Sequence, residues 1–321
     1  MIDEIDKKII YELGIDARQS YKKLAERIGS KKEVVAYRIN QLLNKGIIKK
    51  FVPVFALSRL NIFSSKIYLQ LQGLDQESEK EMLDYLVKSK DIAWAARSVG
   101  RWDLMLGMYT KNIIDFSEKK NDILSRFSRY IKSYDVTQIE DAQVFNRDYL
   151  IGHPINYRKE FIFAGQVGDI RLDETDKKII QLIKNDGRYR SVDVGEKLGL
   201  DSRTIINRVK DLQDEGILQG FTVFIDLNKL GIKFHKLCIH LEEYDKKHLN
   251  TLISFLKKYP NTIHMIKSLG SWELEIETEN EKSDIYEFIT QLKNRFPETI
   301  KQVDLVTMTE ELKLDFFPKT M

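Results

Sequence analysis

Side chains with the chemistry to recognise DNA bases lie at helical spacing just before Gly216. Arg203, Asn207 and Lys210 recur at intervals of four and three residues, which places them on one face of a helix. Asn and Arg side chains match the hydrogen-bonding edges of adenine and guanine, and Lys binds phosphates. The apolar residues of the segment lie on another face: Ile205, Val209 and Leu212. This pattern predicts a helix whose polar face enters the major groove.

A second helix of this kind is predicted within the first fifty residues. There Tyr37 can contact a base or a phosphate, whereas Glu33 would repel the backbone unless it accepts a hydrogen bond from cytosine. An ordinary solvated helix face is the alternative interpretation of both segments. The residues predicted to bind DNA are Lys31, Lys32, Tyr37, Arg38, Ser202, Arg203, Thr204, Asn207, Arg208 and Lys210.

Three predicted helices and a strand position each of these faces. In the N-terminal copy, Asp3 occupies a helix N-cap position, a second helix ends at Gly29, and a third ends at Gly46. Residues 47–51 follow as the strand of a wing. Short helices joined by a glycine turn, with a strand behind them, are typical of a winged helix-turn-helix domain.

The chain is a tandem duplication. Residues 3–10 and 173–180 differ at one position, and the same offset of 170 residues relates Trp102 to Trp272. One period therefore covers at least a hundred residues in constant register, which chance does not produce.

Each repeat continues with strands and helices in the order βαββαβ, the ferredoxin-like plan. The predicted fold class is α+β, with a winged helix-turn-helix domain and a ferredoxin-like sensor domain in each copy. The expected domains are head 1 at residues 1–60, sensor domain 1 at 61–148, a linker at 149–170, head 2 at 171–230 and sensor domain 2 at 231–321. Such a sensor domain leaves one sheet face uncovered by helices, so we expect the two to pair face to face, within one chain or between chains.

The two heads differ in charge. Residues 1–50 hold 12 Lys and Arg against 7 Asp and Glu, whereas residues 171–220 hold 10 against 10. Non-specific DNA affinity comes mainly from neutralised phosphates. Head 1 is therefore expected to supply affinity, and head 2, with the better reading face, more of the specificity.

Composition points to a globular protein, with 42% hydrophobic and 31% charged residues. No apolar run is long enough to span a bilayer and no secretory signal is evident, so we expect a cytoplasmic location. The one cysteine, Cys238, is expected to be buried in a strand. No Cys/His cluster has zinc spacing, so neither a metal nor a cofactor is predicted.

The ordered residues of both copies resemble the Lrp/AsnC family, the leucine-responsive or feast/famine regulators. In head 1 the matching residues are Asp3-Glu4-Ile5-Asp6, Arg18, Gly29, Arg38, Leu42, Gly46-Ile47 and Phe51, with partners 170 residues later in head 2. In the sensor domains they are Ser98 to Leu104 and Ser268 to Leu274. The resemblance implies a DNA-binding transcriptional regulator whose sensor domains dimerise through their sheets and bind small effectors, typically amino acids.

By the same resemblance, effectors would bind near the glycine-aromatic-acidic turn of each sensor domain. The implied contacts are Gly100, Trp102, Asp103, Gly270, Trp272 and Glu273. In the alternative interpretation, the glycine and acidic residues only shape a tight turn, and the tryptophan packs in the dimer core. The fusion of two diverged units suggests an intramolecular pseudo-dimer, or a homo-oligomer, that recognises unlike half-sites.

Two rival functions remain. Siroheme decarboxylases resemble this family and would need His, Arg and Tyr side chains gathered in the sensor cleft. The five histidines are His153, His235, His240, His248 and His264, and none lies in the glycine turn. His264 is the one catalytic candidate, and a structural histidine is the simpler interpretation, so we expect no enzyme. The second rival is an architectural DNA-binding protein without an effector.

Overall fold

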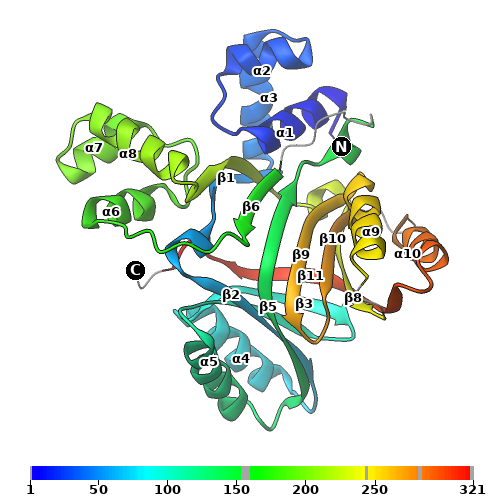
Figure 1. The fold of residues 1–321 in the computed structure, drawn as a ribbon. Helices are drawn as coiled ribbons and strands as arrows, with labels where there is room; N and C mark the ends of the chain where they lie inside the picture. The colour runs from blue at the N-terminus through cyan, green and yellow to red at the C-terminus, as the bar shows by residue number, and fades with distance from the viewer. Residues whose placement is uncertain (1, 153–159, 243–244, 281–283, 319–321) are drawn as a thin grey trace.

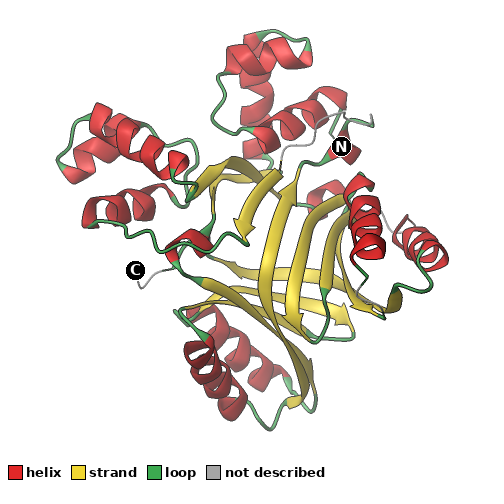
Figure 2. Cartoon of the chain, viewed as in Figure 1, coloured by secondary structure: helices red, strands yellow, loops and turns green. Residues whose placement is uncertain are grey.

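The structure is a computed structural model that describes residues 2–152, 160–242, 245–280 and 284–318. Two helical heads stand side by side on a large β-structure (Figure 1), and four further helices cover the outside of that β-structure (Figure 2). No described helix has the length and apolar content to cross a membrane. The described side chains also include no cluster of three or more His, Cys, Asp or Glu that could hold a metal ion.

Each head contains three helices, capped as the sequence predicts. The side chains of Asp3 and Asp173 accept hydrogen bonds from backbone N–H groups of the first turn, which satisfies donors that have no partner in the helix. Gly29 and Gly199 end the second helices at φ of 69° and 67°, a left-handed conformation that glycine adopts without strain. The helices are α1 Glu4–Ile15, α2 Tyr21–Ile28 and α3 Lys32–Asn44 in head 1, and α6 Glu174–Ile183, α7 Ser191–Leu198 and α8 Ser202–Asp214 in head 2.

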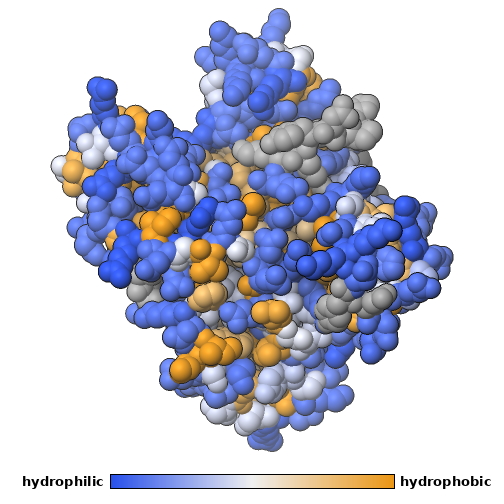
Figure 3. Space-filling model, in the orientation of Figure 1, coloured by the Kyte–Doolittle hydropathy of each residue, from blue (hydrophilic) through white to orange (hydrophobic). Residues whose placement is uncertain are grey.

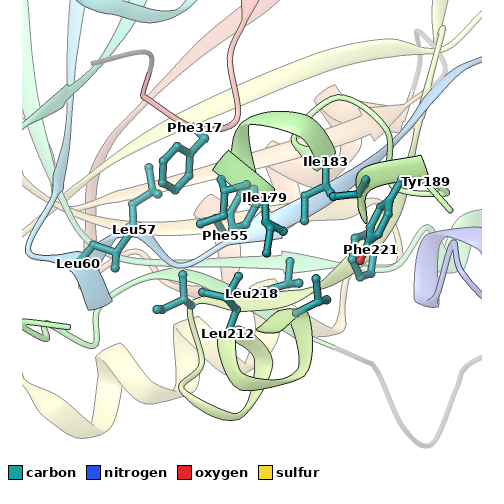
Figure 4. Close-up of a cluster of buried hydrophobic side chains, with 14 of the residues drawn as sticks. Phe55, Leu57, Leu60, Ile179, Ile183, Tyr189, Leu212, Leu218, Phe221 and Phe317 are labelled. Atoms are coloured by element: carbon teal, nitrogen blue, oxygen red, sulfur yellow. The ribbon is translucent and has the colours of Figure 1, made fainter. Parts of the chain in front are cut away.

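The strands after the third helices do not form separate wings. Strand β1 (Ile48–Phe55) pairs antiparallel with β7 (Leu218–Ile225), so the two heads share one ribbon. Each strand also enters the core of the opposite head: Phe55 lies in the core of head 2 (Figure 4), and Val223 in that of head 1. The predicted strands are confirmed, and the partner of each strand is the strand of the other head. The exchange fixes α3 and α8 relative to each other.

Both sensor domains have the predicted βαββαβ order, so the predicted α+β fold class is confirmed. Sensor domain 1 contains β2 Phe63–Leu71, α4 Gln76–Lys88, β3 Ile92–Gly100, β4 Leu104–Thr110, α5 Ile113–Arg126 and β5 Ile131–Phe145. Sensor domain 2 contains β8 Lys233–Leu241, α9 Lys246–Lys258, β9 Thr262–Gly270, β10 Leu274–Asn280, α10 Asp284–Arg295 and β11 Ile300–Leu314. Strand β6 (Glu160–Ala164) and the short 3-10 helices Leu57–Leu60, Asp148–Leu150 and Asn228–Leu230 complete the described elements.

The two sensor sheets close into a barrel within one chain. Strand β3 pairs with β11 and β5 pairs with β9, while β2 pairs with both β4 and β5. The inner faces therefore oppose each other, as expected, but the sheets also join edge to edge. Helices α4 and α5 cover one side of the barrel, and α9 and α10 cover another (Figure 1). Closure leaves eight strands without a free edge along the ring.

A glycine lies at each seam of the barrel. Gly100 and Gly270 have φ of 130° and 140°. A Cβ at Gly100 would lie 2.6 Å from the backbone oxygen of Leu305, and one at Gly270 would lie 2.2 Å from that of Val136. Close approach of two backbones explains both glycines without any ligand.

Replacing Gly270 with Ala is expected to lower the free energy of unfolding by more than about 1 kcal/mol, because both the backbone conformation and the space are unsuited to a Cβ. Chemical denaturation of the full chain measures this loss. Gly14→Ala is the matched control, since nothing lies within 4 Å of its Cβ and the residue is in helix α1. Equal stability of the two variants would contradict the steric account.

Candidate nucleic-acid interface

Helix α8 presents a polar face to solvent. Arg203, Asn207 and Lys210 are exposed, whereas Ile205, Val209 and Leu212 are buried in the core of head 2. The structure therefore brings together the predicted reading side chains on one surface. Sequence inspection missed Ile206, which is 54% exposed on the same helix. An apolar side chain beside Asn207 is suited to contact a thymine methyl group. Ile206 lies three residues after Arg203, and this helical spacing could have indicated that both side chains lie on the same face.

Helix α3 presents a different surface. Tyr37 is 62% exposed, and Lys31, Lys32 and Glu33 are exposed at the start of the helix. Lys31 makes no side-chain capping hydrogen bond, and its exposed ammonium group is suited to bind a phosphate. Head 1 thus offers positive charge, the ring of Tyr37 and the exposed amide of Asn40, whereas head 2 offers the guanidinium of Arg203 and the amide of Asn207.

The N-terminus of α8 is closed by its own residues. Asp201 accepts hydrogen bonds from the backbone N–H groups of Arg203 and Thr204, and from the Thr204 hydroxyl at 2.6 Å. The Thr204 hydroxyl proton is therefore donated to Asp201 at the exposed start of the helix, and the oxygen lone pairs of Thr204 remain for DNA. Ser202, also predicted to bind DNA, is half-buried in the first turn of the helix.

The two predicted arginines Arg38 and Arg208 tie the recognition helices to the first helices. Arg208 Nη1 lies 2.6 Å from Asp173 Oδ2 and 3.2 Å from Asp176 Oδ1. Arg38 Nη1 lies 2.7 Å from Asp3 Oδ2, in the equivalent position. These guanidinium groups hold α3 and α8 in place. Replacing either arginine is therefore expected to change the stability of its head as well as any contact with DNA.

Arg208→Gln is expected to reduce the stability of head 2 by up to about 1 kcal/mol, the usual size for partly exposed ion pairs. Thermal unfolding at low and high salt measures the change, which is expected to shrink as salt screens the pair. Arg203→Gln on the free face of α8 is the matched control and is expected to leave stability unchanged. A larger loss from Arg203→Gln would contradict this division of roles.

The residues of the predicted effector turns are satisfied within the protein. Asp103 Oδ2 accepts from the Leu71 N–H at 2.7 Å, and Glu273 Oε2 accepts from the Leu241 N–H at 2.9 Å. The rings of Trp102 and Trp272 lie 4.9 Å apart inside the barrel, and both are buried. This geometry matches turn-shaping residues and a packed core. An effector at Gly100, Trp102, Asp103, Gly270, Trp272 and Glu273 stays a prediction.

A buried charge cluster inside the barrel was not predicted. Lys66 Nζ and Lys236 Nζ lie 2.5 Å and 3.0 Å from Glu275 Oε2, and Tyr68 donates to Glu275 Oε1 at 2.8 Å. Lys236 also lies 2.8 Å from Glu277 Oε1. Burial alone would raise the pKa of Glu275, but Lys236 and Lys66 overcome this and lower it to about 2. We call these five residues the barrel cluster.

The histidines do not gather at one place in the described structure. His264 Nδ1 lies 2.7 Å from Glu277 Oε2, so its imidazole borders the barrel cluster. His240 Nε2 lies 3.0 Å from Asp304 across the pair β8 and β11, and on the same pair His235 contacts Thr307. His153 lies outside the described residues. The position of His264 fits the structural interpretation given above.

Known proteins match both the heads and the whole fold. A family model for the AsnC-type helix-turn-helix domain matches residues 2–43, and a model for winged helix-turn-helix DNA-binding matches residues 172–219. The HTH-type transcriptional regulator FL11 of Pyrococcus horikoshii is 29% identical over 115 residues, which cover 36% of this chain and 75% of that protein. The transcriptional regulator AzlB of Bacillus subtilis is 30% identical over 103 residues, covering 32% of this chain and 66% of that protein.

Among solved structures, the siroheme decarboxylase NirDL superposes with a TM-score of 0.64 at 13% identity, over 98% of this chain and 93% of that one. At this identity the likeness establishes a shared fold alone. The two family models match the heads. Each of the two regulators matches about a third of the chain, as expected for a protein similar to one of two repeats. The chain therefore carries an AsnC-type helix-turn-helix domain in head 1 and a winged helix-turn-helix DNA-binding domain in head 2, and it is similar to transcriptional regulators over about a third of its length.

Proposed function

We propose that the protein is a sequence-specific DNA-binding transcriptional regulator that recognises two unlike half-sites with one chain. The observation that carries this proposal is the pair of recognition helices, α3 and α8, whose polar faces are exposed on heads joined by one ribbon. Because the ribbon fixes the heads, the spacing of the half-sites is set by the protein and not by association of two chains.

The two heads are suited to different parts of the task. Head 1 carries the excess of positive charge in its first fifty residues, and charge supports sequence-independent affinity. Head 2 carries Arg203, Ile206 and Asn207 on one exposed face, and such side chains discriminate bases. We infer that head 1 contributes more affinity and head 2 more specificity.

A non-enzymatic role is part of the proposal. The curated relatives are named as transcriptional regulators, whereas the decarboxylase shares the fold at 13% identity. The Lys and Glu side chains of the barrel cluster are paired with each other, which leaves little charge for a substrate. If mixing the protein with a tetrapyrrole produced the absorbance band of the bound compound, that result would count against a non-enzymatic role. A regulator must reach the DNA that it binds, so the proposed location of the protein is the cytoplasm.

A small effector remains part of the proposal, with amino acids as the first class to screen. A true ligand at about 100 times its dissociation constant adds about 2.7 kcal/mol of stability. A thermal-shift screen of the full chain therefore separates an effector-regulated protein from an architectural one.

The test of the proposed function is binding of the full-length protein to the DNA upstream of its own gene, titrated with salt. We expect tight binding that weakens steeply as salt rises, and at least about a thousandfold preference over random DNA. Equal affinity for both DNAs would overturn sequence-specific recognition. Absence of binding at low salt would overturn DNA binding altogether.

A further inference from the structure

An open cavity of about 290 Å³ lies between the two heads. Its lining comes from the segments that lead into α2 and α7, on the two heads whose outer parts are separated by a notch in Figure 3. The lining residues are Arg18, Gln19, Ser20, Tyr21 and Arg188. Neither recognition helix contributes to this lining.

Two arginines at equivalent positions of the repeat meet in the cavity. Arg18 Nη1 donates to the backbone oxygens of Gly187 and Tyr189 at 3.1 and 3.2 Å. Arg188 Nε donates to the backbone oxygen of Ala17 at 2.5 Å. Each arginine thus reaches across to the opposite head, and the carbonyl groups it contacts are uncharged.

Neither arginine of this pair makes a close ion pair with a described residue, although Arg18 lies over the ring of Tyr189 and Arg188 over that of Phe51. Within the described residues, no carboxylate oxygen lies within 4.0 Å of either guanidinium. Burial lowers the pKa of Arg188, Tyr21 and Asp16 oppose this effect, and the like charge of Arg18 adds to it, although a guanidinium stays protonated. Two permanent positive charges that share a cavity are stabilised when an anion lies between them.

We propose that Arg18 and Arg188 bind a backbone phosphate of DNA where the duplex passes between the heads. This inference rests on the proposed function and adds a central contact to it. Ser20 caps the N-terminus of α2, the first helix of the helix-turn-helix motif, and in such motifs that helix crosses the DNA backbone. The cavity therefore lies beside the part of the head that meets phosphates, and guanidinium groups match phosphate geometry.

The test compares the salt dependence of DNA binding for the wild-type full chain and for three double variants of it. Each lost phosphate contact lowers the slope of log K against log salt by about 0.9, so Arg18→Gln/Arg188→Gln, which removes the one phosphate that both arginines share, is expected to lower it by about 0.9. Arg18→Lys/Arg188→Lys keeps both charges and is expected to keep the slope, even where it loses thermal stability. Arg126→Gln/Arg295→Gln on the outer helices α5 and α10 is the matched control and is expected to keep the slope.

Three results would overturn the inference. An unchanged slope in the Gln variant, with DNA still bound, would exclude the phosphate contact while leaving the proposed function intact. An equal loss in the Lys and Gln variants would make the arginines a structural clasp between the heads. A thermal shift with inorganic pyrophosphate that requires both arginines, together with an unchanged DNA slope, would assign the cavity to a small anion. If the wild-type chain binds no DNA, the proposed function fails first.

Discussion

Glu275→Gln is expected to lower the free energy of unfolding by about 3–5 kcal/mol, the usual cost of removing one partner from a buried ion pair. The Glu275 side chain is fully buried and contacts both Lys66 and Lys236. Its neutral replacement leaves two ammonium groups in the barrel that share the single charge of Glu277. Denaturant titration of the full chain, followed by tryptophan fluorescence, measures the loss near Trp272, whose Nε1 donates to Glu275 Oε1 at 3.1 Å.

Two further variants show whether charge is the cause. Glu242→Gln removes an exposed carboxylate 3.6 Å from Lys301 and is expected to change stability by less than about 0.5 kcal/mol. Lys66→Met/Glu275→Met removes one charge of each sign and is expected to cost less than the two single changes added together. Additive costs would mean that the barrel tolerates unpaired charge, and would contradict the account.

Acid should weaken the barrel through the same residue. The folded-state pKa of Glu275 is about 2, below its ordinary value of 4.5, so its stabilising effect is full above pH 4.5 and is lost as pH falls towards 2. The wild-type chain is therefore expected to lose more stability between pH 5 and pH 2 than Lys66→Met/Glu275→Met does. Parallel pH profiles for the two proteins would contradict the assignment.

The barrel cluster also explains why unlike sensor domains pair. Lys66 and Lys236 are equivalent positions of the repeat, whereas Met105 and Gly107 stand where sensor domain 2 has Glu275 and Glu277. Two copies of sensor domain 1 would bury two lysines without a carboxylate. Two copies of sensor domain 2 would bury four glutamates with two lysines. Only a mixed pair balances the charges, and burial of unbalanced charge is costly.

The fold could be predicted from sequence wherever the information is local. Caps at Asp3 and Asp173, glycines at helix ends and apolar stripes depend on residues a few positions apart. The ribbon between β1 and β7 could not be predicted, because a strand sequence does not specify which partner supplies its hydrogen bonds. Barrel closure could not be predicted for the same reason, since it depends on pairings between residues far apart in the sequence, such as Thr137 with Gly270.

The candidate DNA-binding site, too, could be predicted only where the information is local. Helical spacing placed Arg203, Asn207 and Lys210 on one surface because that surface lies on a single helix. Spacing could not show that Arg208 is held by Asp173 from another helix. Nor could it bring Arg18 to Arg188, which share a cavity only because the heads are intertwined.

Asn207→Ala is expected to weaken binding to the specific site by about 5- to 150-fold, the equivalent of the 1–3 kcal/mol that a bidentate contact to adenine supplies. Asn207 is exposed on α8, one turn from Arg203 and beside Ile206. Its side chain is uncharged, so binding to random DNA and the salt slope are expected to stay unchanged. Competition titrations with specific and random duplexes measure both quantities.

Asn250→Ala on the sensor helix α9 is the matched control, because it makes the same chemical change on an exposed residue outside the heads. It is expected to leave both affinities unchanged. A replacement at Asn207 that weakened specific and random binding equally would place α8 on the DNA backbone and not in the groove. Specificity would then have to come from head 1, through Tyr37, or from the deformability of DNA held between two fixed heads.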